Sequence, residues 1–168
     1  MLKIFNELEV FFEDCYREFS VREYSRKIGL SPPTSSKILK NFTKEGLLLS
    51  REDRGFLLFK VNRRNKNMKN LSRIYWNYKL EELVDFIKEE FYSDAIILFG
   101  SLSKLESKKD SDIDLIVLGK SKKEINLSKF EKKFCREIQI FFYEDIGKIN
   151  KELRFNVLNG HLLSGHIK

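Results

Sequence analysis

Residues 95–118 read AIILFGSLSKLESKKDSDIDLIVL, and this stretch decides the fold expected for the C-terminal half of the chain. It opens with an unbroken apolar run, Ala95 to Phe99, which has the length and composition of a strand buried on both faces. A second apolar run, Ile113 to Leu118, begins directly after Asp112. The two runs predict two strands of one small sheet, separated by a polar segment.

The polar residues at the ends of these strands predict a site for a metal ion and a phosphate. Residues two apart in a strand share a face, so Asp112 and Asp114 project together. Two neighbouring carboxylates repel each other unless a cation lies between them, and such oxygen ligands suit Mg²⁺ shared with substrate phosphates. Gly100 allows a close approach of the backbone to a ligand, and Ser101 can cap a following helix whose free N–H groups attract phosphate. Together these residues predict a site for Mg²⁺ and a nucleoside triphosphate.

The spacing of these residues resembles a known signature. Gly100-Ser101, ten further residues and then Asp112-Ile113-Asp114 are similar to the signature of the minimal nucleotidyltransferases of the DNA polymerase β superfamily. The resemblance extends over residues 86–166. It implies that the Gly-Ser pair holds the triphosphate and that the two aspartates are catalytic and bind the metal. It also implies Mg²⁺ as the cofactor and ATP or another nucleoside triphosphate as the substrate.

The chain departs from that family at three positions. The family commonly has an arginine and then a glycine after the Gly-Ser helix, where this chain has Lys104 and Leu105. Lys104 keeps a positive charge for nucleotide binding without the bidentate grip of arginine, and Leu105 lacks the backbone freedom of glycine. The family takes a third carboxylate from its third strand, where the hydrophobic pattern of this chain places Gln139. Glu137, about 6–7 Å earlier along the same strand face, is the remaining candidate for a third catalytic acid.

The N-terminal half differs from the rest of the chain in charge. Residues 1–80 carry 17 Lys and Arg against 9 Asp and Glu, whereas residues 81–168 carry 15 against 16. The net charge of +7 therefore lies in the first half. Such an asymmetry indicates an anionic partner for that half, most simply nucleic acid.

Hydrophobic periodicity predicts three helices and a hairpin in the first 62 residues. The expected helices are residues 2–16, 21–28 and 31–45, and the expected strands are 47–50 and 56–61. Ser20 and Glu23 have the spacing of a capping box, and Ser31-Pro32 is a typical helix start. This order of elements resembles the winged helix-turn-helix domains of transcription regulators.

The winged-helix resemblance implies DNA binding through the third helix and the hairpin tip. A small polar and basic helix face can enter a major groove and contact bases and phosphates, and a wing touches the backbone or minor groove. The residues implied in DNA binding are Thr34, Ser36, Lys37, Lys40 and Asn41 on the helix and Arg51 and Arg54 on the wing.

The remaining pattern predicts two domains of the α/β (α+β) class. A winged helix-turn-helix domain (1–62) is followed by a basic linker that enters a helix (63–79) and by a minimal nucleotidyltransferase domain with a small mixed sheet (80–168). Within the last domain we expect an exposed basic turn at 120–124. We also expect helices at 80–91, 127–135 and 144–159, a strand at 137–143 and a short closing strand.

The composition also favours a cytoplasmic protein. No apolar run approaches the ~20 residues of a membrane span, and the first ten residues do not have the pattern of a signal peptide. Cys15 and Cys135 are far apart and lack metal-ligand spacing, so we interpret both as small buried side chains.

Three functions remain open on the sequence. The first, which we favour, is a nucleotidyltransferase that transfers a nucleoside monophosphate such as AMP to a protein or another acceptor, with DNA binding in the same chain. The second is an antitoxin, because minimal nucleotidyltransferases are often paired with HEPN-domain ribonuclease toxins. The third is a DNA-binding transcription regulator whose nucleotidyltransferase domain is weakly active or inactive and senses a nucleotide. A homodimer follows only by analogy with other winged helices.

Overall fold

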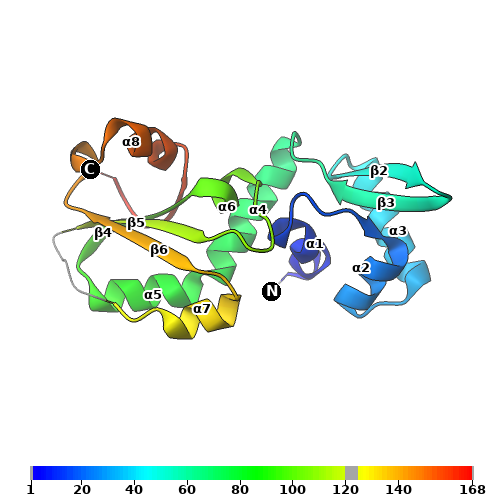
Figure 1. Cartoon of the computed structure of the whole chain (residues 1–168), viewed down its shortest axis with the longest axis horizontal. Helices are drawn as coiled ribbons and strands as arrows, with labels where there is room; N and C mark the ends of the chain where they lie inside the picture. Colours follow the sequence, from blue (N-terminus) through cyan, green and yellow to red (C-terminus); the bar gives the residue numbers. More distant parts are fainter. Residues whose placement is uncertain (1, 120–124, 168) are drawn as a thin grey trace. The chain divides into compact units, whose positions relative to one another are not determined.

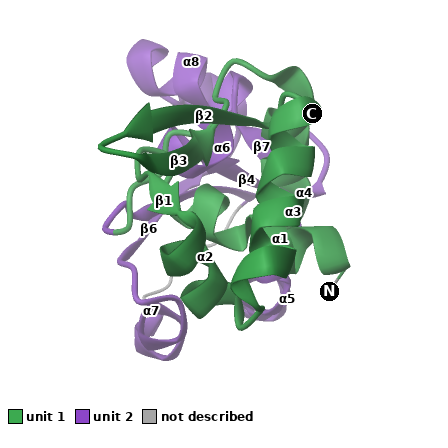
Figure 2. Cartoon of the chain, turned by 90° about the vertical axis from the view of Figure 1, so that its right-hand side faces the viewer, with its two compact units in different colours: residues 1–75, 105–109 green, residues 76–104, 110–168 purple. Residues whose placement is uncertain are grey.

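The computed structural model describes residues 2–119 and 125–167 and contains eight α-helices and two sheets within them. The mixture of helices and sheets confirms the α+β class. The chain divides into two compact units (Figure 2): unit 1 is residues 1–75 and 105–109, and unit 2 is residues 76–104 and 110–168. None of the helices in the described ranges is long and apolar enough to cross a membrane.

Unit 1 consists of helices and an antiparallel sheet with the strand order β1-β3-β2 (Figure 1). Its elements are α1 (Lys3–Glu13), β1 (Phe19–Ser20), α2 (Val21–Ile28), α3 (Pro32–Lys44), β2 (Leu48–Asp53) and β3 (Phe56–Val61). The order of helices and hairpin is the expected one, and the assignment as a winged helix stays a prediction.

Local sequence signals set the helix starts of unit 1. The capping box is present, since Ser20 Oγ accepts a hydrogen bond from Glu23 N while the Glu23 carboxylate accepts one from Ser20 N. Ser31 Oγ accepts a hydrogen bond from Thr34 N at the start of α3, with Pro32 in the first turn. The hairpin is longer than predicted, because β2 continues to Asp53. The turn consists of Arg54 and Gly55 alone.

The core of unit 1 is largely aromatic. Phe11, Phe19 and Tyr24 are fully buried, with the Phe11 and Phe19 rings 5.3 Å apart in an edge-to-face arrangement. Tyr24 lies beside Phe11 and donates a hydrogen bond from its hydroxyl to Glu7 O at 2.7 Å. These contacts join α1, α2 and the sheet of unit 1.

Residues 105–109 belong to unit 1, although their neighbours in sequence belong to unit 2. Ser107 O accepts a hydrogen bond from Cys15 N at 2.8 Å, and the Ser107 hydroxyl bonds both to Cys15 Sγ and to Phe12 O. Burial raises the pKa of the Cys15 thiol to about 11, so the thiol stays neutral. Cys15 is buried as predicted. The same prediction was wrong for Cys135, which is exposed because it forms the left-handed end of a helix at the surface.

Most of the basic stretch after β3 is helical. Helix α4 spans Lys66–Lys79 and begins five residues before the predicted helical spacing at Leu71. Asn65 Oδ1 accepts a hydrogen bond from Met68 N at 2.9 Å in its first turn. Met68 is fully buried, which explains why this polar segment forms an ordered helix.

Unit 2 is a mixed sheet with helices on both faces. Its elements are α5 (Glu81–Glu90), β4 (Ser93–Phe99), α6 (Gly100–Lys104), β5 (Ile113–Gly119), α7 (Ser128–Phe134), β6 (Ile138–Tyr143), the 3-10 helix η1 (Ile146–Lys148), α8 (Lys151–Leu158) and β7 (His161–Gly165). The strand order is β6-β5-β4-β7, with β5 and β6 parallel and the other pairs antiparallel. Helices α5 and α7 lie on one face and α8 on the other (Figure 1).

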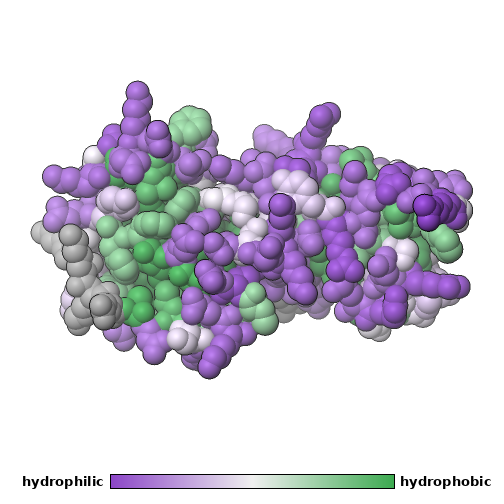
Figure 3. All heavy atoms as spheres, in the orientation of Figure 1, coloured by the Kyte–Doolittle hydropathy of each residue, from purple (hydrophilic) through white to green (hydrophobic). Residues whose placement is uncertain are grey.

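Both central strands are buried as predicted. Ala95 to Phe99 and Leu115 to Leu118 are buried along their whole length. On the α8 face, Ile97 and Ile116 pack with Ile149 and Val157 in one hydrophobic cluster. In the view of Figure 3, apolar side chains gather over the sheet of unit 2, while hydrophilic side chains dominate the surface of unit 1.

The C-terminal elements differ from the prediction in one respect. The helix expected over 144–159 is divided into η1 and α8. Asp145 accepts hydrogen bonds from Gly147 N and Lys148 N, and Asn150 Oδ1 accepts one from Leu153 N. Each of these side chains caps the start of a new helix. The apolar spacing continues across the break and therefore did not reveal it. The closing strand is present as β7, and the turn predicted at 120–124 lies outside the described residues.

Candidate functional site

The strand register of unit 2 brings the predicted site residues to one end of the sheet. Asp114 pairs with Phe99 of β4 on one side and with Gln139 of β6 on the other. Cross-strand partners share a face, and Phe99 belongs to the cluster on the α8 face. The site therefore lies on the α8 side of the sheet, where β4 ends and β5 begins.

Gly100 is required at this position by two features of the backbone. Its φ is +69°, in the left-handed region that favours glycine. A Cβ atom added to Gly100 would lie 2.0 Å from Asp114 Oδ2. Any side chain here would therefore displace the Asp114 carboxylate from the turn that begins α6.

The two aspartates form an electrostatically unfavourable pair. Burial and then the charge of Asp112 raise the pKa of Asp114 to about 6. A cation beside both carboxylates would remove the repulsion and favour their ionised forms. Among the residues that the structure describes, no group of three or more His, Cys, Asp or Glu side chains is arranged to hold a metal.

Gln139 occupies the position of the expected third carboxylate. It is in register with Asp114, and its Nε2 donates a hydrogen bond to Asp112 Oδ2 at 2.7 Å. Glu137 is exposed, and its carboxylate has no hydrogen bond or ion pair within residues 2–119 and 125–167. Its main-chain oxygen accepts a hydrogen bond from Ile113 N. The geometry thus brings Gln139 to the two aspartates and leaves Glu137 outside.

The structure also shows how Lys104 and Leu105, the other two departures from the family, are accommodated. Lys104 Nζ donates a hydrogen bond to Asn156 Oδ1 of α8 at 3.0 Å, so its ammonium group is held near the end of α6. The sequence does not indicate Asn156, because only the packing of α8 on the sheet brings this residue close to Lys104. Leu105 has a φ of +61° and a fully buried side chain. The left-handed conformation that favours glycine is therefore kept by leucine, at roughly 1–2 kcal/mol of backbone strain.

Comparison with known proteins identifies the family of this unit. Residues 81–166, just over half of the chain, match the family described as Polymerase beta, Nucleotidyltransferase. The chain belongs to this family. The matched span contains Gly100, Ser101, Asp112 and Asp114. Neither a curated protein nor a solved structure matches the chain significantly.

The residues predicted to contact DNA lie in unit 1. Helix α3 carries no acidic residue. Four of its predicted residues are exposed and Ser36 is half-buried; the exposed ones are Thr34, Lys37, Lys40 and Asn41. In the hairpin, the Arg51 guanidinium donates to both carboxylate oxygens of Glu18, at 2.9 and 3.0 Å from Nε. Arg54 is at the tip of the turn with a φ of +49° and has no ion pair in the described part of the chain.

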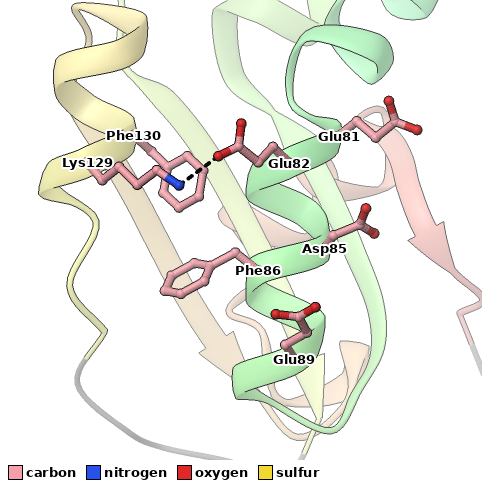
Figure 4. Close-up of a pocket in the computed structure, with 7 residues that line it drawn as sticks. All are labelled: Glu81, Glu82, Asp85, Phe86, Glu89, Lys129 and Phe130. Atoms are coloured by element: carbon pink, nitrogen blue, oxygen red, sulfur yellow. Dashed lines mark hydrogen bonds and ion pairs between the residues drawn. The ribbon is translucent and has the colours of Figure 1, made fainter.

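A separate cavity of unit 2 lies between α5 and α7 (Figure 4). Its volume is about 430 Å³, and none of the residues around Gly100 and Asp114 lines it. Phe86 and Phe130 contribute rings 5.2 Å apart, with acidic side chains of α5 around them. The ammonium groups of Lys129 and Lys133 bind Glu82 and hold the pKa of its carboxyl at about 2. The cavity therefore has no part in the chemistry of the aspartates.

The raised pKa of Asp114 predicts a pH-dependent effect of Asp114→Asn on stability. Because the folded-state pKa lies above the model value of 3.8, the folded state binds the proton more tightly, and wild-type stability falls as the pH rises from about 4 to about 6. The asparagine variant lacks this loss. At pH 7 we expect it to be more stable by about 1 kcal/mol, a value reduced for the partial exposure of the group.

Urea denaturation between pH 4 and pH 7.5 measures this difference. Asp112→Asn serves as the comparison and should give a smaller gain, because burial, not the charge of Asp112, is the larger cause of the shift. Identical pH profiles for the wild type and Asp114→Asn would contradict the prediction.

Proposed function

We propose that this chain binds a nucleoside triphosphate together with Mg²⁺ and transfers a nucleoside monophosphate, such as AMP from ATP, to an acceptor hydroxyl. The observation that carries the proposal is the convergence of Asp112, Asp114 and Gly100 at one end of the sheet. Membership of the polymerase beta nucleotidyltransferase family supports the same reaction class.

The donor set fits one divalent cation better than two. Asp112 and Asp114 offer hard oxygen ligands, and Mg²⁺ is commonly held by one or two carboxylates plus substrate phosphates. When bound, the ion would neutralise charge on the triphosphate and activate the attacking oxygen. Gln139 adds no charge, since it is a neutral amide that donates to Asp112. A second metal ion would therefore lack the third carboxylate.

The chain's own residues would orient the triphosphate. At Gly100 the missing side chain leaves room for the Asp114 carboxylate to lie directly against the backbone. Ser101 follows at the start of α6 and offers its N–H and hydroxyl as donors. Lys104 brings a positive charge, and its hydrogen bond to Asn156 fixes where that charge lies.

Gln139 also favours a second candidate function. A site with one carboxylate fewer would bind a nucleotide and transfer it slowly or not at all. The chain would then act as a DNA-binding regulator that senses the nucleotide, or as an antitoxin that binds a HEPN-domain toxin. Loss of transfer together with retained nucleotide binding is the property that separates this candidate from the first.

We further propose that unit 1 is a winged helix that binds DNA through α3. The support is the set of exposed Lys37, Lys40 and Asn41 on a helix without acidic residues. Arg51 is engaged by Glu18, so Arg54 at the hairpin tip is the better candidate for a contact with the DNA backbone.

Calorimetric titration of ATP and GTP, with Mg²⁺ and with a chelator, tests the nucleotide site. We expect Mg²⁺-dependent binding by the wild type that is lost in the double variant Asp112→Asn with Asp114→Asn. Gly100→Ala should weaken this binding at least about tenfold, because its Cβ would displace the Asp114 carboxylate. Gly29→Ala is the matched control, since Gly29 has a φ of +68° but no atom within 4 Å of an added Cβ. Absence of Mg²⁺-dependent binding by the wild type would refute the site.

Gln139→Glu tests whether the missing carboxylate limits the reaction. The substitution places a negative charge in register with Asp114, and we expect pyrophosphate release from Mg²⁺-ATP to rise by about 10²-fold. Gln139→Ala removes the hydrogen bond to Asp112 without adding a charge and should not produce this gain. Equal rates for wild type and Gln139→Glu would show that the third carboxylate does not limit transfer.

Salt-dependent binding to duplex DNA of random sequence tests the role of α3. Each phosphate contact contributes about −0.9 to the slope of log K against log salt, so Lys37→Gln with Lys40→Gln should reduce the slope by roughly 2. Lys132→Gln with Lys151→Gln removes two exposed lysines of unit 2 and should leave the slope unchanged. A slope that both double variants change equally would speak against α3 as the contact surface.

A further inference from the structure

Unit 1 contains a cavity that neither the nucleotide site nor the proposed DNA-binding face uses. Its volume is about 570 Å³, which is within the range of small-molecule sites. The lining comes from the segment that follows α1, the β2–β3 hairpin and the segment that follows β3, and it includes Tyr16, Leu49, Lys60, Arg63 and Arg64. All of the lining residues belong to unit 1.

The charge of this lining is entirely positive. Lys60, Arg63 and Arg64 contribute cations, and no carboxylate is among the described residues that line the cavity. The carboxylates nearest to these cations lie outside it: Glu18 is 3.5 Å from Lys60 Nζ, and Glu106 is 2.9 Å from Arg63 Nη2. The cavity is therefore a place where an anion would meet three cationic side chains.

The Arg63 guanidinium is already oriented. It bonds to the Glu106 carboxylate and lies over the Tyr16 ring at 4.3 Å from the ring centre. Guanidinium groups carry five N–H donors, so donors remain for a second anion. Arg64 has no ion pair in the described ranges, and its main-chain N is fixed by a hydrogen bond to Asn62 Oδ1. A guanidinium that is held like that of Arg63 binds phosphate oxygens with less loss of entropy than a mobile lysine.

The cavity also offers apolar surface beside the cations. Leu49 is opposite Lys60 in the β2–β3 register, so both project from the same face of the sheet. Both apolar side chains are accessible to a ligand, since Leu49 is 44% exposed and Tyr16 is 48% exposed. Arg63 lies over the Tyr16 ring, as does Lys108 Nζ at 5.8 Å from its centre, so a base would contact the exposed edge of this ring and the Leu49 side chain. The combination fits a molecule with a flat apolar part and a strongly anionic part.

We propose that this cavity binds a mononucleotide, with its phosphates on Lys60, Arg63 and Arg64 and its base against Tyr16 and Leu49. The cavity is larger than inorganic phosphate needs, and its volume suits a small molecule. The residues involved are distinct from Asp112 and Asp114 and from the exposed face of α3. The proposal does not depend on the nucleotidyl transfer proposed above.

Calorimetric titration of ADP in the presence of a chelator tests the proposal on the full-length double variant Asp112→Asn with Asp114→Asn. That background removes the Mg²⁺-dependent site, so any remaining binding is separate from it. We expect ADP to bind, and Arg63→Gln with Arg64→Gln to weaken it at least about tenfold. Arg22→Gln with Lys27→Gln removes two exposed cations of α2 that do not line the cavity and should leave the affinity unchanged.

Tyr16→Ala distinguishes base contact from phosphate contact. It should weaken ADP more than inorganic pyrophosphate, because both ligands lose the ring that orients Arg63 but only ADP also loses a contact with its base. Arg64→Gln alone controls for misfolding, since the Arg64 side chain has no partner in the described residues. This variant should also bind ADP more weakly. Absence of ADP binding by the double variant, or equal losses in the α2 control, would overturn the proposal. So would a finding that Asp112→Asn with Asp114→Asn binds a single-stranded oligonucleotide through Arg63 and Arg64 and does not bind ADP.

Discussion

The close approach of the Asp114 carboxylate to the backbone at Gly100 is the constraint on which the nucleotidyltransferase site depends. With a hypothetical Cβ only 2.0 Å from Asp114 Oδ2, the carboxylate and the turn can coexist only if the residue is glycine. The same packing partly buries Asp114 beside Asp112 and raises its pKa. The sheet therefore holds two carboxylates in an arrangement that opposes stability in the absence of a cation. Such strain at one position in an otherwise well-packed unit is typical of functional sites.

Of the three departures from the family pattern, only Gln139 changes the charge of the site. Leu105 keeps the left-handed backbone of the glycine it replaces, and burial of its side chain offsets the strain. Lys104 keeps a cation at the end of α6, oriented by Asn156. Gln139 keeps the register of the third strand but supplies an amide that hydrogen-bonds to Asp112 in place of a carboxylate. The site therefore has one carboxylate fewer than the family pattern, which explains why the fold is easier to assign than the rate of the reaction.

The sequence predicted the parts of the structure that depend on local pattern. The apolar runs gave β4 and β5, and the spacing of Ser20 and Glu23 gave the start of α2. The position of Gln139 followed from aligning the hydrophobic pattern of the third strand with the family it resembles. The hydrogen bond from Lys104 to Asn156 could not be predicted, because it depends on how α8 packs against the sheet. The break between η1 and α8 was missed for a related reason: two polar caps interrupt a helix without interrupting its hydrophobic spacing.

The polar stretch after β3 shows how a segment rich in asparagine and basic residues can form ordered structure. Asn62 and Asn65 both donate from Nδ2 to Gly46 O, at 2.8 and 3.0 Å, and Asn65 also caps the first turn of α4. These amides take the place of main-chain partners and fix the path of the chain without a hydrophobic side chain. Arg63 and Arg64, which lie between them, are thereby presented from an ordered backbone. A segment with the composition of a flexible linker thus has the rigidity that a binding site for an anion requires.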